Sequence, residues 1–366
     1  MSQQKVLGFP TTTSEPVYTL TTKPIPAPGP TEVLVKLEGS ALQPLEWRIP
    51  VIAPLFNSLK FPASAGVDGA GVVESVGSEV KRLKKGDRVL FQGWLEYDYT
   101  TFQQYALAPE IFVAKLPSSL STLEASSIPS AVVTAAAGFS HPESAIPSPT
   151  EVGQHLKSFF DGRGGAGVKP FWEDGAEGVK AGEPILILGG SSSVGQLVIQ
   201  IAKHLGYSPI ITTSSLKHTD HLKSLGATHV LDRSTPDVSL VSDIQAITQN
   251  KPIELVYDAV GAITQAQIDL LAPGGAFVLA DPMALGPKFV FNDGRRLLLV
   301  GGAVHGFKEF GASLFEKLES LLERGVIKPL RVEKLPGGLN GILDGLARLQ
   351  RNEVSGIKLV VDPSET

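Results

Sequence analysis

The alternation of apolar and polar residues changes its period near the middle of the chain. Residues 185–188 form a short run of apolar side chains, which is typical of a buried strand. From Val194 to Leu205 the apolar side chains recur at the spacing of an amphipathic helix. Residues 189–195 are glycine and serine apart from Val194, and Gly206 closes the helix. The pattern therefore predicts a strand, a tight turn and a helix.

This turn departs from the G-x-G-x-x-G pattern of dinucleotide-binding turns, because Ser192 occupies the position of the central glycine. Glycine-rich turns let a pyrophosphate approach the backbone and aim a helix N-terminus at it. Serine hydroxyls can also donate to phosphate oxygens. Many turns of small residues bind nothing, but the strand before this one and the helix after it favour a nucleotide site. We expect that site to be formed by Gly190, Ser191, Ser192, Ser193, Val194 and Gly195.

Strands and helices alternate downstream of the turn. The expected strands are residues 209–213, 228–232, 254–259, 276–280 and 295–300, and the expected helices are residues 219–225, 240–248 and 264–271. This alternation predicts a doubly wound parallel sheet with helices on both faces, and a ligand at the carboxyl ends of its strands. Amphipathic helices at 315–324 and 339–349 and a strand at 358–361 follow.

The N-terminal third has the pattern of a β domain. We expect an extended segment rich in proline at 24–30, a strand at 32–38, a polar and apolar turn at 41–48, a glycine-rich strand pair at 65–77, and a turn that leads into a strand at 86–91. Glycine inside strands marks bulges or a close approach of backbones. These short strands therefore predict a compact, bent β-barrel.

Between the two patterns lies an insertion. Residues 123–139 are expected to be helical with a break at Pro129, and residues 141–180 follow with little periodicity. Such long loops are typical of lids or disordered insertions. Residues 154–160 are predicted to form one helical piece, whereas the glycine-rich residues 162–167 lack a preceding strand and are predicted to be loop. Phe171 and Trp172 either anchor a lid or, as we favour, pack against the surface.

Length and composition narrow the class of protein. The 366 residues are too many for one ordinary core, so two domains are expected. The net charge of −5 gives no electrostatic footprint for nucleic acid or an anionic membrane, and no apolar run has the length of a membrane span. We therefore expect a cytoplasmic protein. The absence of cysteine excludes disulfides, thiolate nucleophiles and Cys-ligated zinc, and the scattered histidines complete no ligand set.

The end of the second strand of the parallel sheet distinguishes NAD from NADP. An acidic residue there would bind the adenosine ribose, whereas cations and hydroxyls accept a 2′-phosphate. The chain has no acid in this stretch before Asp220, so we favour NADPH. The alternative is that this segment is an ordinary helix start with Ser215 or Thr219 as its N-cap, and both roles can hold at once. The expected phosphate-side residues are Thr213, Ser214, Ser215, Lys217, His218 and, after the next strand, Arg233.

Several motifs together resemble one family. They are residues 41–44 (ALQP), 66–73 (GVDGAGVV), 86–89 (GDRV), 134–136 (TAA), 189–195 (GGSSSVG), 258–261 (DAVG) and 354–361 (VSGIKLVV). In this order and spacing they resemble the medium-chain dehydrogenase/reductase superfamily, in its zinc-independent branch of quinone oxidoreductases and enoyl reductases. The GGSSSVG form is most similar to fungal trans-acting enoyl reductases.

The resemblance implies a fold and further site residues. It implies an α/β protein with a GroES-like β-barrel catalytic domain at 1–135 and 325–366, and a Rossmann NADPH-binding domain at 136–324 that contains the insertion 141–180. It also implies that Gln43 and Thr134 line the nicotinamide pocket, and that Val260, Gly261, Gly356 and Lys358 contribute to cofactor binding. Arg48 is our candidate for a cation at the pocket mouth, held by Trp47, although an ordinary surface arginine is an equal alternative.

Two departures from the family bear on the chemistry. Zinc-dependent relatives carry a cysteine near Gln43 and a histidine at the position of Val67, so we expect no metal site. The enone-reducing branch usually has asparagine where Gln43 stands. The additional methylene group of glutamine shifts the amide by about one bond length. Tyr97 and Tyr99 lie in a polar loop and could donate a proton, but we favour the alternative that they are ordinary loop tyrosines exposed to solvent.

These observations favour an NADPH-dependent, metal-independent reductase that transfers a hydride to an activated C=C bond of an enone, enal or enoyl thioester, or to a quinone. The alternatives are a carbonyl or alcohol dehydrogenase for aromatic substrates, and an NADPH-binding protein without turnover. We expect a small-molecule substrate, either bulky or attached to a carrier, and no nucleic-acid or membrane partner. Monomer and homodimer both stay open, and residues 295–300 are the apolar candidate edge for a dimer.

Overall fold

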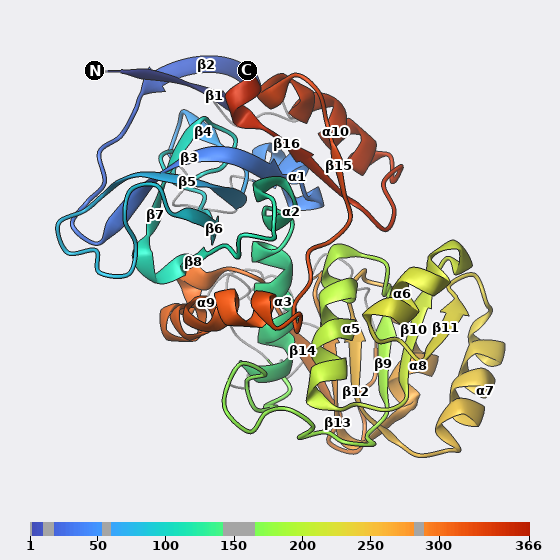
Figure 1. The fold of residues 1–366 in the computed structure, drawn as a ribbon. Coiled ribbons are helices and arrows are strands. Elements are labelled where there is room, and N and C mark those ends of the chain that lie inside the picture. The colour runs from blue at the N-terminus through green and yellow to red at the C-terminus, as the bar shows by residue number, and fades with distance from the viewer. Residues whose placement is uncertain (1, 10–17, 53–59, 142–164, 282–288) are drawn as a thin grey trace. The chain divides into compact units, whose positions relative to one another are not determined.

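The computed structural model describes residues 2–9, 18–52, 60–141, 165–281 and 289–366 (Figure 1). The chain divides into two compact units. One unit comprises Met1–Ser130, Gly311–Glu323 and Pro329–Thr366, and the other comprises Ala131–Phe310 and Arg324–Lys328. These units differ from the expected boundaries in three places, because residues 131–135 and 325–328 group with the second unit and residues 311–323 group with the first.

The first unit is built on strands that pair antiparallel, except for the parallel pair β15 and β16. Its larger sheet has the order β15-β16-β3-β5-β6-β8, with β7 paired to β3, and a smaller sheet has the order β2-β1-β4. The bounds are β1 Gln3–Phe9, β2 Thr19–Pro24, β3 Glu32–Ala41, β4 Ala63–Ser64, β5 Asp68–Val76, β6 Arg88–Gln92, β7 Tyr105–Pro109, β8 Val113–Lys115, β15 Val332–Lys334 and β16 Lys358–Val361. Helices α1 Pro44–Ile52, α2 Thr122–Ala125, α9 Lys308–Glu323 and α10 Gly341–Gln350 accompany them.

Glycine in β5 permits the bend of this sheet. A Cβ atom at Gly71 would lie 2.0 Å from the carbonyl oxygen of Lys36 on the neighbouring strand β3. The register of β3 against β5 shifts at Leu34/Val35 and again at Leu37/Gly39. Register shifts of this kind mark bulges, which kink and twist a strand. The interior is apolar and includes Val35, Leu37, Val73 and Phe91. The bent β domain that the sequence predicted is confirmed.

Two local predictions in this unit were wrong. Residues 41–48 do not form a turn throughout, because helix α1 begins at Pro44. Proline suits the first helical position, and the Glu46 carboxylate accepts the backbone N–H of Gln43, as in one half of a capping box. Residues 65–77 are not a strand pair. Gly66, at φ +89°, separates the two-residue strand β4 from the single long strand β5.

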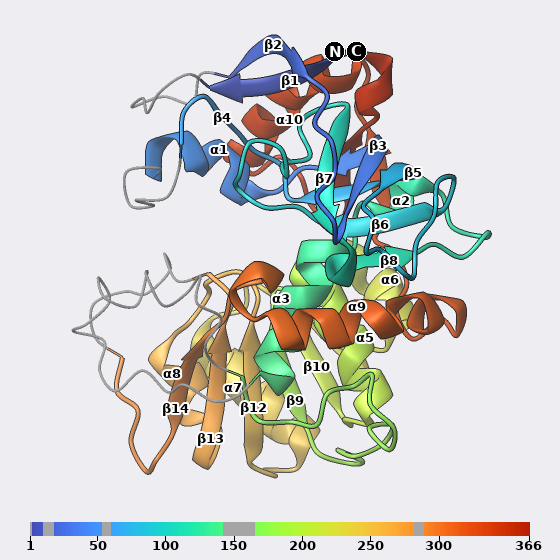
Figure 2. The same ribbon diagram turned by 90° about the vertical axis from the view of Figure 1, so that its left-hand side faces the viewer.

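The second unit carries a parallel sheet in the order β11-β10-β9-β12-β13-β14, and its strands lie side by side in Figure 2. The bounds are β9 Ile185–Leu188, β10 Ile210–Ser214, β11 His229–Asp232, β12 Ile253–Asp258, β13 Leu271–Leu279 and β14 Arg296–Leu299. The helices are α3 Pro129–Ser140, α5 Ser193–Leu205, α6 Thr219–Leu225, α7 Asp237–Thr248 and α8 Gln265–Asp269. Each strand and helix expected from residue 185 to residue 300 is present.

Both faces of this sheet are covered. Leu186 and Leu188 pack with Leu240 and Ile244 of α7 in one apolar cluster. Side chains alternate across a strand, so Ile187 points to the opposite face, where it is also fully buried. The doubly wound α/β prediction is therefore confirmed. The strands that follow β9 along the chain lie first on one side of it (β10, β11) and then on the other (β12 to β14). Such sheets bind ligands at the point where the strand order reverses in this way.

The described part of the insertion is anchored by aromatic packing. The Phe171 ring meets Trp172 edge-on at 5.2 Å between centroids, and Trp172 meets Phe310 at 5.1 Å. Both residues are buried, in agreement with the packing role that we favoured over a lid anchor. The helical piece at 154–160 and the first part of the glycine-rich loop lie outside the described residues.

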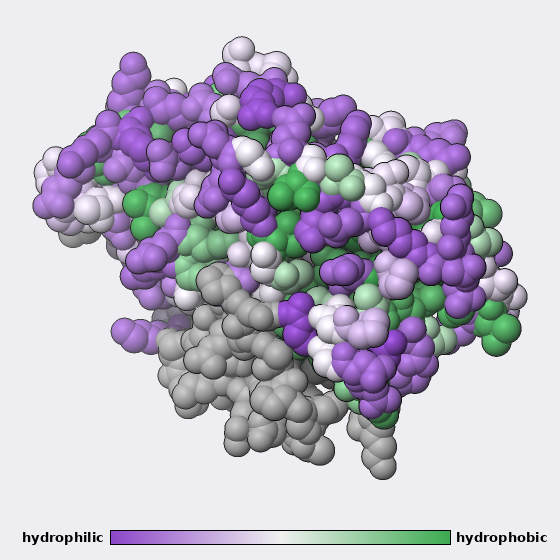
Figure 3. Space-filling model, turned by 90° about the horizontal axis from the view of Figure 1, so that it is seen from below, coloured by the Kyte–Doolittle hydropathy of each residue, from purple (hydrophilic) through white to green (hydrophobic). Residues whose placement is uncertain are grey.

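No helix in the described ranges is long and apolar enough to cross a membrane. Among the coloured residues of the face in Figure 3, hydrophilic residues are widely spread and hydrophobic residues lie in several patches between them.

Candidate functional site

The glycine and serine turn lies at the carboxyl end of β9 and leads into α5. Gly190 cannot carry a side chain without rearrangement, because a Cβ atom there would lie 2.1 Å from Thr212 Oγ1. A Cβ atom at Gly195 would lie 2.3 Å from the carbonyl oxygen of Gly189. Ser192 caps the helix, since its Oγ accepts the backbone N–H of Gly195 at 3.0 Å. The turn thus brings backbone and hydroxyls to the helix N-terminus, where an anion is favoured.

The neighbouring strand β10 ends in hydroxyl side chains. Thr213 Oγ1 accepts the backbone N–H of Gly189 at 3.2 Å, which ties the strand end to the turn. Ser214 is 1 % exposed, and its Oγ has no hydrogen-bond partner among the described residues. A buried hydroxyl without a partner is costly in a protein that binds nothing there. Ser214 therefore fits a site that a polar ligand completes.

Two cations follow this strand end in exposed positions. Lys217 lies in the short turn Leu216–His218, Arg233 follows β11, and both are exposed. Asp232 Oδ1 accepts the backbone N–H and the hydroxyl of Ser234 within the same turn. The end of β10 is thus followed by two exposed cations, and it carries a buried hydroxyl at Ser214.

The helix-cap alternative holds in part, because Ser215 occupies the N-cap position of the 3-10 turn Leu216–His218, whereas Thr219 is the first residue of α6 and not its N-cap. Ser215 precedes the turn that begins at Leu216 but makes no capping hydrogen bond through its side chain. Thr219 instead donates its hydroxyl to the carbonyl of Leu216 at 2.7 Å. His218 is buried, and its side chain does not cap α6.

The next strand, β12, ends in a buried carboxyl group beside the turn. Asp258 Oδ1 accepts the backbone N–H groups of Val260 and Gly261 at 3.0 and 2.8 Å. Its Oδ2 is buried without a hydrogen-bond partner among the described residues, and burial raises the pKa of Asp258 to about 6. Val260 lies against the turn, because a Cβ atom at Gly189 would meet its Cγ1 at 2.4 Å. The predicted residues therefore lie together at the carboxyl ends of the strands β9, β10 and β12; they are residues 190–195, 213–214 and 260–261.

In the first unit, Gln43 lies directly before α1. Its backbone N–H donates to Glu46 at 2.7 Å, and its Oε1 lies 3.4 Å from the hydroxyl of Ser130. Gln43 is partly exposed, but its Nε2 is buried and has no hydrogen-bond partner among the described residues. This amide nitrogen is a donor available to a ligand.

A buried ion pair adjoins this amide. Lys358 Nζ lies 3.1 Å from Asp68 Oδ2, and the two side chains are 4 % and 0 % exposed. Asp68 also accepts the backbone N–H of Ser130 at 2.7 Å and its hydroxyl at 2.6 Å. Lys358 therefore has a partner within its own unit, and Gly356 lies nearby at φ +72° with its carbonyl bonded to Arg331. The cofactor role expected for Gly356 and Lys358 stays a prediction.

Glu46 is the second buried carboxyl group near Gln43. It is 0 % exposed, and burial raises its pKa to about 8, against the lowering effects of the Gln43 N–H and of Lys358. Its Oε1 has no hydrogen-bond partner among the described residues. Burial therefore favours the protonated, neutral form of the Glu46 carboxyl group.

The other expected pocket residues have distinct surroundings. The Arg48 guanidinium lies over the Trp47 ring at 5.0 Å from its centroid, so the predicted contact between them is present. Thr134 in α3 is 9 % exposed, and its carbonyl accepts the hydroxyl of Tyr257 at 2.7 Å. Burial raises the pKa of Tyr99, and so does the hydrogen bond that its hydroxyl donates to Glu32. The pocket roles of Arg48 and Thr134 stay predictions.

Four polar residues near the site were not predicted from the sequence, namely Asp68, Ser130, Glu46 and Asp258. Asp68 stands in a run of glycine and apolar residues, where a carboxylate must find a partner when it is buried. Glu46 has the spacing to Gln43 that a capping box requires. No local pattern links Ser130 or Lys358 to Asp68, because their contacts bring three distant segments of the chain together.

A metal site does not fit these residues. The chain has no cysteine, and no group of His, Asp or Glu in the described ranges is placed to hold a metal ion. The two carboxyl groups near Gln43 are engaged with an ammonium group and with backbone N–H groups. The donor set thus lacks the three protein ligands that catalytic zinc requires.

Comparison with known proteins places the chain in a family. Residues 29–118 match the family described as "Alcohol dehydrogenase GroES-like domain", and residues 193–319 match "Zinc-binding dehydrogenase". A trans-enoyl reductase of Aspergillus japonicus, himH, is 30 % identical over 345 residues, which cover 92 % of this chain and 90 % of the relative. The chain therefore belongs to the medium-chain dehydrogenase/reductase family.

Other relatives fall in the same branch. A 2-methylene-furan-3-one reductase of Solanum lycopersicum is 28 % identical over 338 residues, covering 91 % of this chain and 72 % of the relative. The crystal structure of a quinone oxidoreductase of Pseudomonas syringae has a TM-score of 0.73 at 25 % identity and covers 98 % of this chain and 100 % of its own. The chain thus lies among quinone oxidoreductases and enoyl reductases, and the family predicted from its motifs is confirmed.

Proposed function

We propose that this protein is an NADPH-dependent, metal-independent reductase that transfers a hydride to an activated C=C bond, or to a quinone. The observation that carries the proposal is the buried, unpartnered Nε2 of Gln43, next to a residue set that does not fit zinc. Reduction of a conjugated carbonyl compound places negative charge on the carbonyl oxygen, and a preorganised donor stabilises that charge. The names of the enoyl, furanone and quinone reductases among the relatives support the same chemistry.

The cofactor is proposed to be held by the turn 189–195 and by the ends of β10 and β12. Backbone groups of Gly190 and Gly195 and the hydroxyls of Ser191 and Ser193 suit the pyrophosphate. Ser214, Lys217 and Arg233 suit a 2′-phosphate, because two are exposed cations and the third is an unpartnered hydroxyl. When bound, the nicotinamide supplies the hydride.

The remaining catalytic work falls to residues that orient and stabilise the substrate. Gln43 Nε2 donates to the carbonyl oxygen as it gains charge, and it does so from a buried position where the bond is strong. Thr134 lines the nicotinamide side, and Arg48 offers a cation to an anionic or carrier-bound substrate. Much of the rate enhancement comes from positioning donor and acceptor, so no single side chain has to serve as the indispensable acid.

The function is tested by following NADPH absorbance with a panel of quinones, enones and enoyl thioesters, and by assaying the reverse oxidation of aromatic alcohols. We expect turnover with members of the first panel that a strong zinc chelator leaves unchanged. Alcohol oxidation in preference to conjugate reduction would point to a dehydrogenase. Tight NADPH binding without turnover of any acceptor would point to a binding protein.

Cofactor preference is tested separately by Lys217→Glu. We expect the dissociation constant of NADPH to rise about tenfold or more, because a repulsive charge replaces a phosphate contact. NADH lacks the 2′-phosphate, so its dissociation constant should change little. Equal weakening of both cofactors in a fluorescence titration would contradict the NADPH assignment. Lys223→Glu on the neighbouring helix α6 is the matched control for a change of net charge.

A further inference from the structure

The second unit contains a pocket that none of the predicted site residues lines. Its volume is about 240 Å³, and its walls include Gln200 and Lys203 of α5, and Arg324 and Lys328 of the segment that follows α9. Lys203 lies ten residues after Ser193, the first residue of α5, so it is about 15 Å along the helix from the glycine and serine turn. We propose that this cationic pocket binds a phosphate group, either of free inorganic phosphate or of a small monoester. The site is independent of the reduction proposed above.

The charge of the cationic pocket favours a dianion. Three of its described side chains are cations, and Glu177 is the one carboxylate among them, with His204 counted as neutral. The pocket thus has an excess of two positive charges in a chain whose net charge is −5. A phosphate group carries about −1.5 to −2 at pH 7, whereas a carboxylate ligand carries a single charge and would leave part of the excess uncompensated.

The volume of the pocket limits the size of the ligand. Pockets for drug-sized ligands typically measure about 300–1,000 Å³. The cationic pocket, at about 240 Å³, falls below this range. It therefore favours a small anion over a second dinucleotide.

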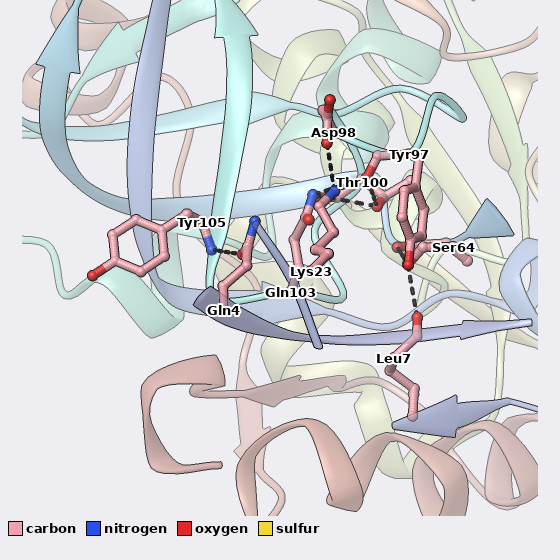
Figure 4. A network of polar contacts seen from close by, with 10 residues as sticks. Gln4, Leu7, Lys23, Ser64, Tyr97, Asp98, Thr100, Gln103 and Tyr105 are labelled. Atoms are coloured by element: carbon pink, nitrogen blue, oxygen red, sulfur yellow. Dashed lines mark hydrogen bonds and ion pairs between the residues drawn. The ribbon is translucent and has the colours of Figure 1, made fainter. Parts of the chain in front are cut away.

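Two of the three cations have no counter-ion. Lys23 of the first unit provides the contrast, because its Nζ lies 2.6 Å from Asp98 and 2.8 Å from the carbonyl oxygen of Tyr97 (Figure 4). The Nζ atoms of Lys203 and Lys328 have no hydrogen bond or ion pair with any residue that the structure describes. Cations that line one pocket repel each other, and an anion bound between them replaces that repulsion by attraction.

The third cation has only a weak partner. Arg324 Nη2 lies 3.9 Å from Glu177 Oε2, and the two side chains are 57 % and 76 % exposed. An ion pair of this length in solvent contributes little. The guanidinium group of Arg324 is therefore available to a ligand, and its planar shape suits two parallel hydrogen bonds to phosphate oxygens.

The backbone that carries these cations is anchored. The side chain of Gln200 is buried, its Oε1 accepts the backbone N–H of Lys328 at 2.7 Å, and its Nε2 donates to the carbonyl of the same residue at 3.4 Å. The side chain of Lys203 lies against Gly226, where an added Cβ atom would come within 2.9 Å of its Cβ and Cδ. A preorganised site lowers the entropy that binding costs.

Stabilisation of a helix end is the alternative role for these cations. Lys203 lies in the last turn of α5, where a cation offsets the partial negative charge of free carbonyl groups. The N–H of Gly206 already bonds to the carbonyls of Ala202 and Lys203 in that turn. Lys328 lies outside the helices, so this role does not account for its place in the pocket.

The test is isothermal titration calorimetry of the full chain with inorganic phosphate. We expect saturable binding whose dissociation constant rises about tenfold or more in the double variant Lys203→Gln/Lys328→Gln, because two charged contacts are lost. Lys223→Gln is the matched control, since Lys223 is an exposed lysine of α6 that does not line the pocket. It should leave the dissociation constant unchanged.

Two further arms sharpen the assignment. Glu177→Gln should bind phosphate more tightly, because it removes a carboxylate from the lining, and a purely structural role of the cations would not produce such a gain. Glycerol 3-phosphate is titrated alongside inorganic phosphate. Tighter binding of glycerol 3-phosphate would identify a monoester as the ligand, tighter binding of inorganic phosphate would identify the free ion, and both results support the proposal.

The candidate cofactor site is controlled by Lys217→Glu, which should keep the phosphate binding that the double variant loses. A loss in Lys217→Glu with full binding in Lys203→Gln/Lys328→Gln would place the phosphate in the cofactor site and overturn the proposal. Absence of saturable phosphate binding would overturn it as well. Binding of an oligo-glutamate peptide through the same lysines, without binding of phosphate, would assign the pocket to an acidic protein partner instead.

Discussion

Removal of Lys358 should destabilise the protein far more than removal of Lys23, although both are buried lysines in ion pairs. In Lys358→Met, Asp68 stays 0 % exposed without a counter-ion, and in Lys23→Met the partner Asp98 is 45 % exposed and regains water. Breaking a buried pair costs about 3–5 kcal/mol, whereas a pair with a solvated partner contributes up to about 1 kcal/mol. Asp68 keeps two hydrogen bonds from Ser130, which places the expected cost near the lower limit, about 3 kcal/mol.

The assay is urea unfolding of the full chain at pH 7, read by fluorescence and circular dichroism. Addition of Asp68→Asn to Lys358→Met should recover part of the loss, because it removes the unpaired buried charge. The reasoning would be refuted if Lys358→Met lowered the unfolding free energy no more than Lys23→Met did. It would also be refuted if the loss in the double variant Lys358→Met/Asp68→Asn equalled the sum of the losses in the two single variants.

Two further predictions concern single sites. Glu46→Gln should stabilise the protein increasingly as the pH rises from 4.5 to about 8, because the folded carboxyl keeps its proton up to about pH 8 while the unfolded one loses it near 4.5. A stability difference that shrinks over this range, measured by thermal unfolding at several pH values, would contradict the burial of a neutral Glu46. Gly190→Ala should lower the unfolding free energy by about 1–3 kcal/mol and weaken NADPH binding, because its Cβ would lie 2.1 Å from Thr212 Oγ1. Calorimetric titration and urea unfolding would show this, and Ser191→Ala in the same turn should leave stability nearly unchanged.

The fold was largely predictable because its signals are local. The change from strand to helix period across residues 185–205 marks the turn directly, and glycine and proline mark the strand ends of the first unit. The errors also have local causes. Residues 41–48 are too short and too mixed in polarity to show a helical period, so only Pro44 and the spacing from Gln43 to Glu46 indicate α1.

The site was predictable only in part. Residues 190–195, 213–214 and 260–261 follow strands in a recognisable pattern, so the topology brings them together. Gln43 lies next to Ser130, Ser130 donates to Asp68, and Asp68 pairs with Lys358, so the cluster joins separate segments of the chain. Sequence separation hides such a cluster, since each polar residue taken alone is compatible with solvent exposure. The side chains of Ser130, Asp68 and Lys358 are identified as one network only by their burial in the structure.

The transfer of hydride to a conjugated C=C bond is tested most directly with NADPH that carries deuterium at the nicotinamide C4. After incubation with an enone or enoyl thioester, the product is analysed by NMR. We expect deuterium at the β-carbon, with solvent hydrogen at the α-carbon and the carbonyl group retained. Deuterium at the carbonyl carbon, with the C=C bond intact, would contradict it.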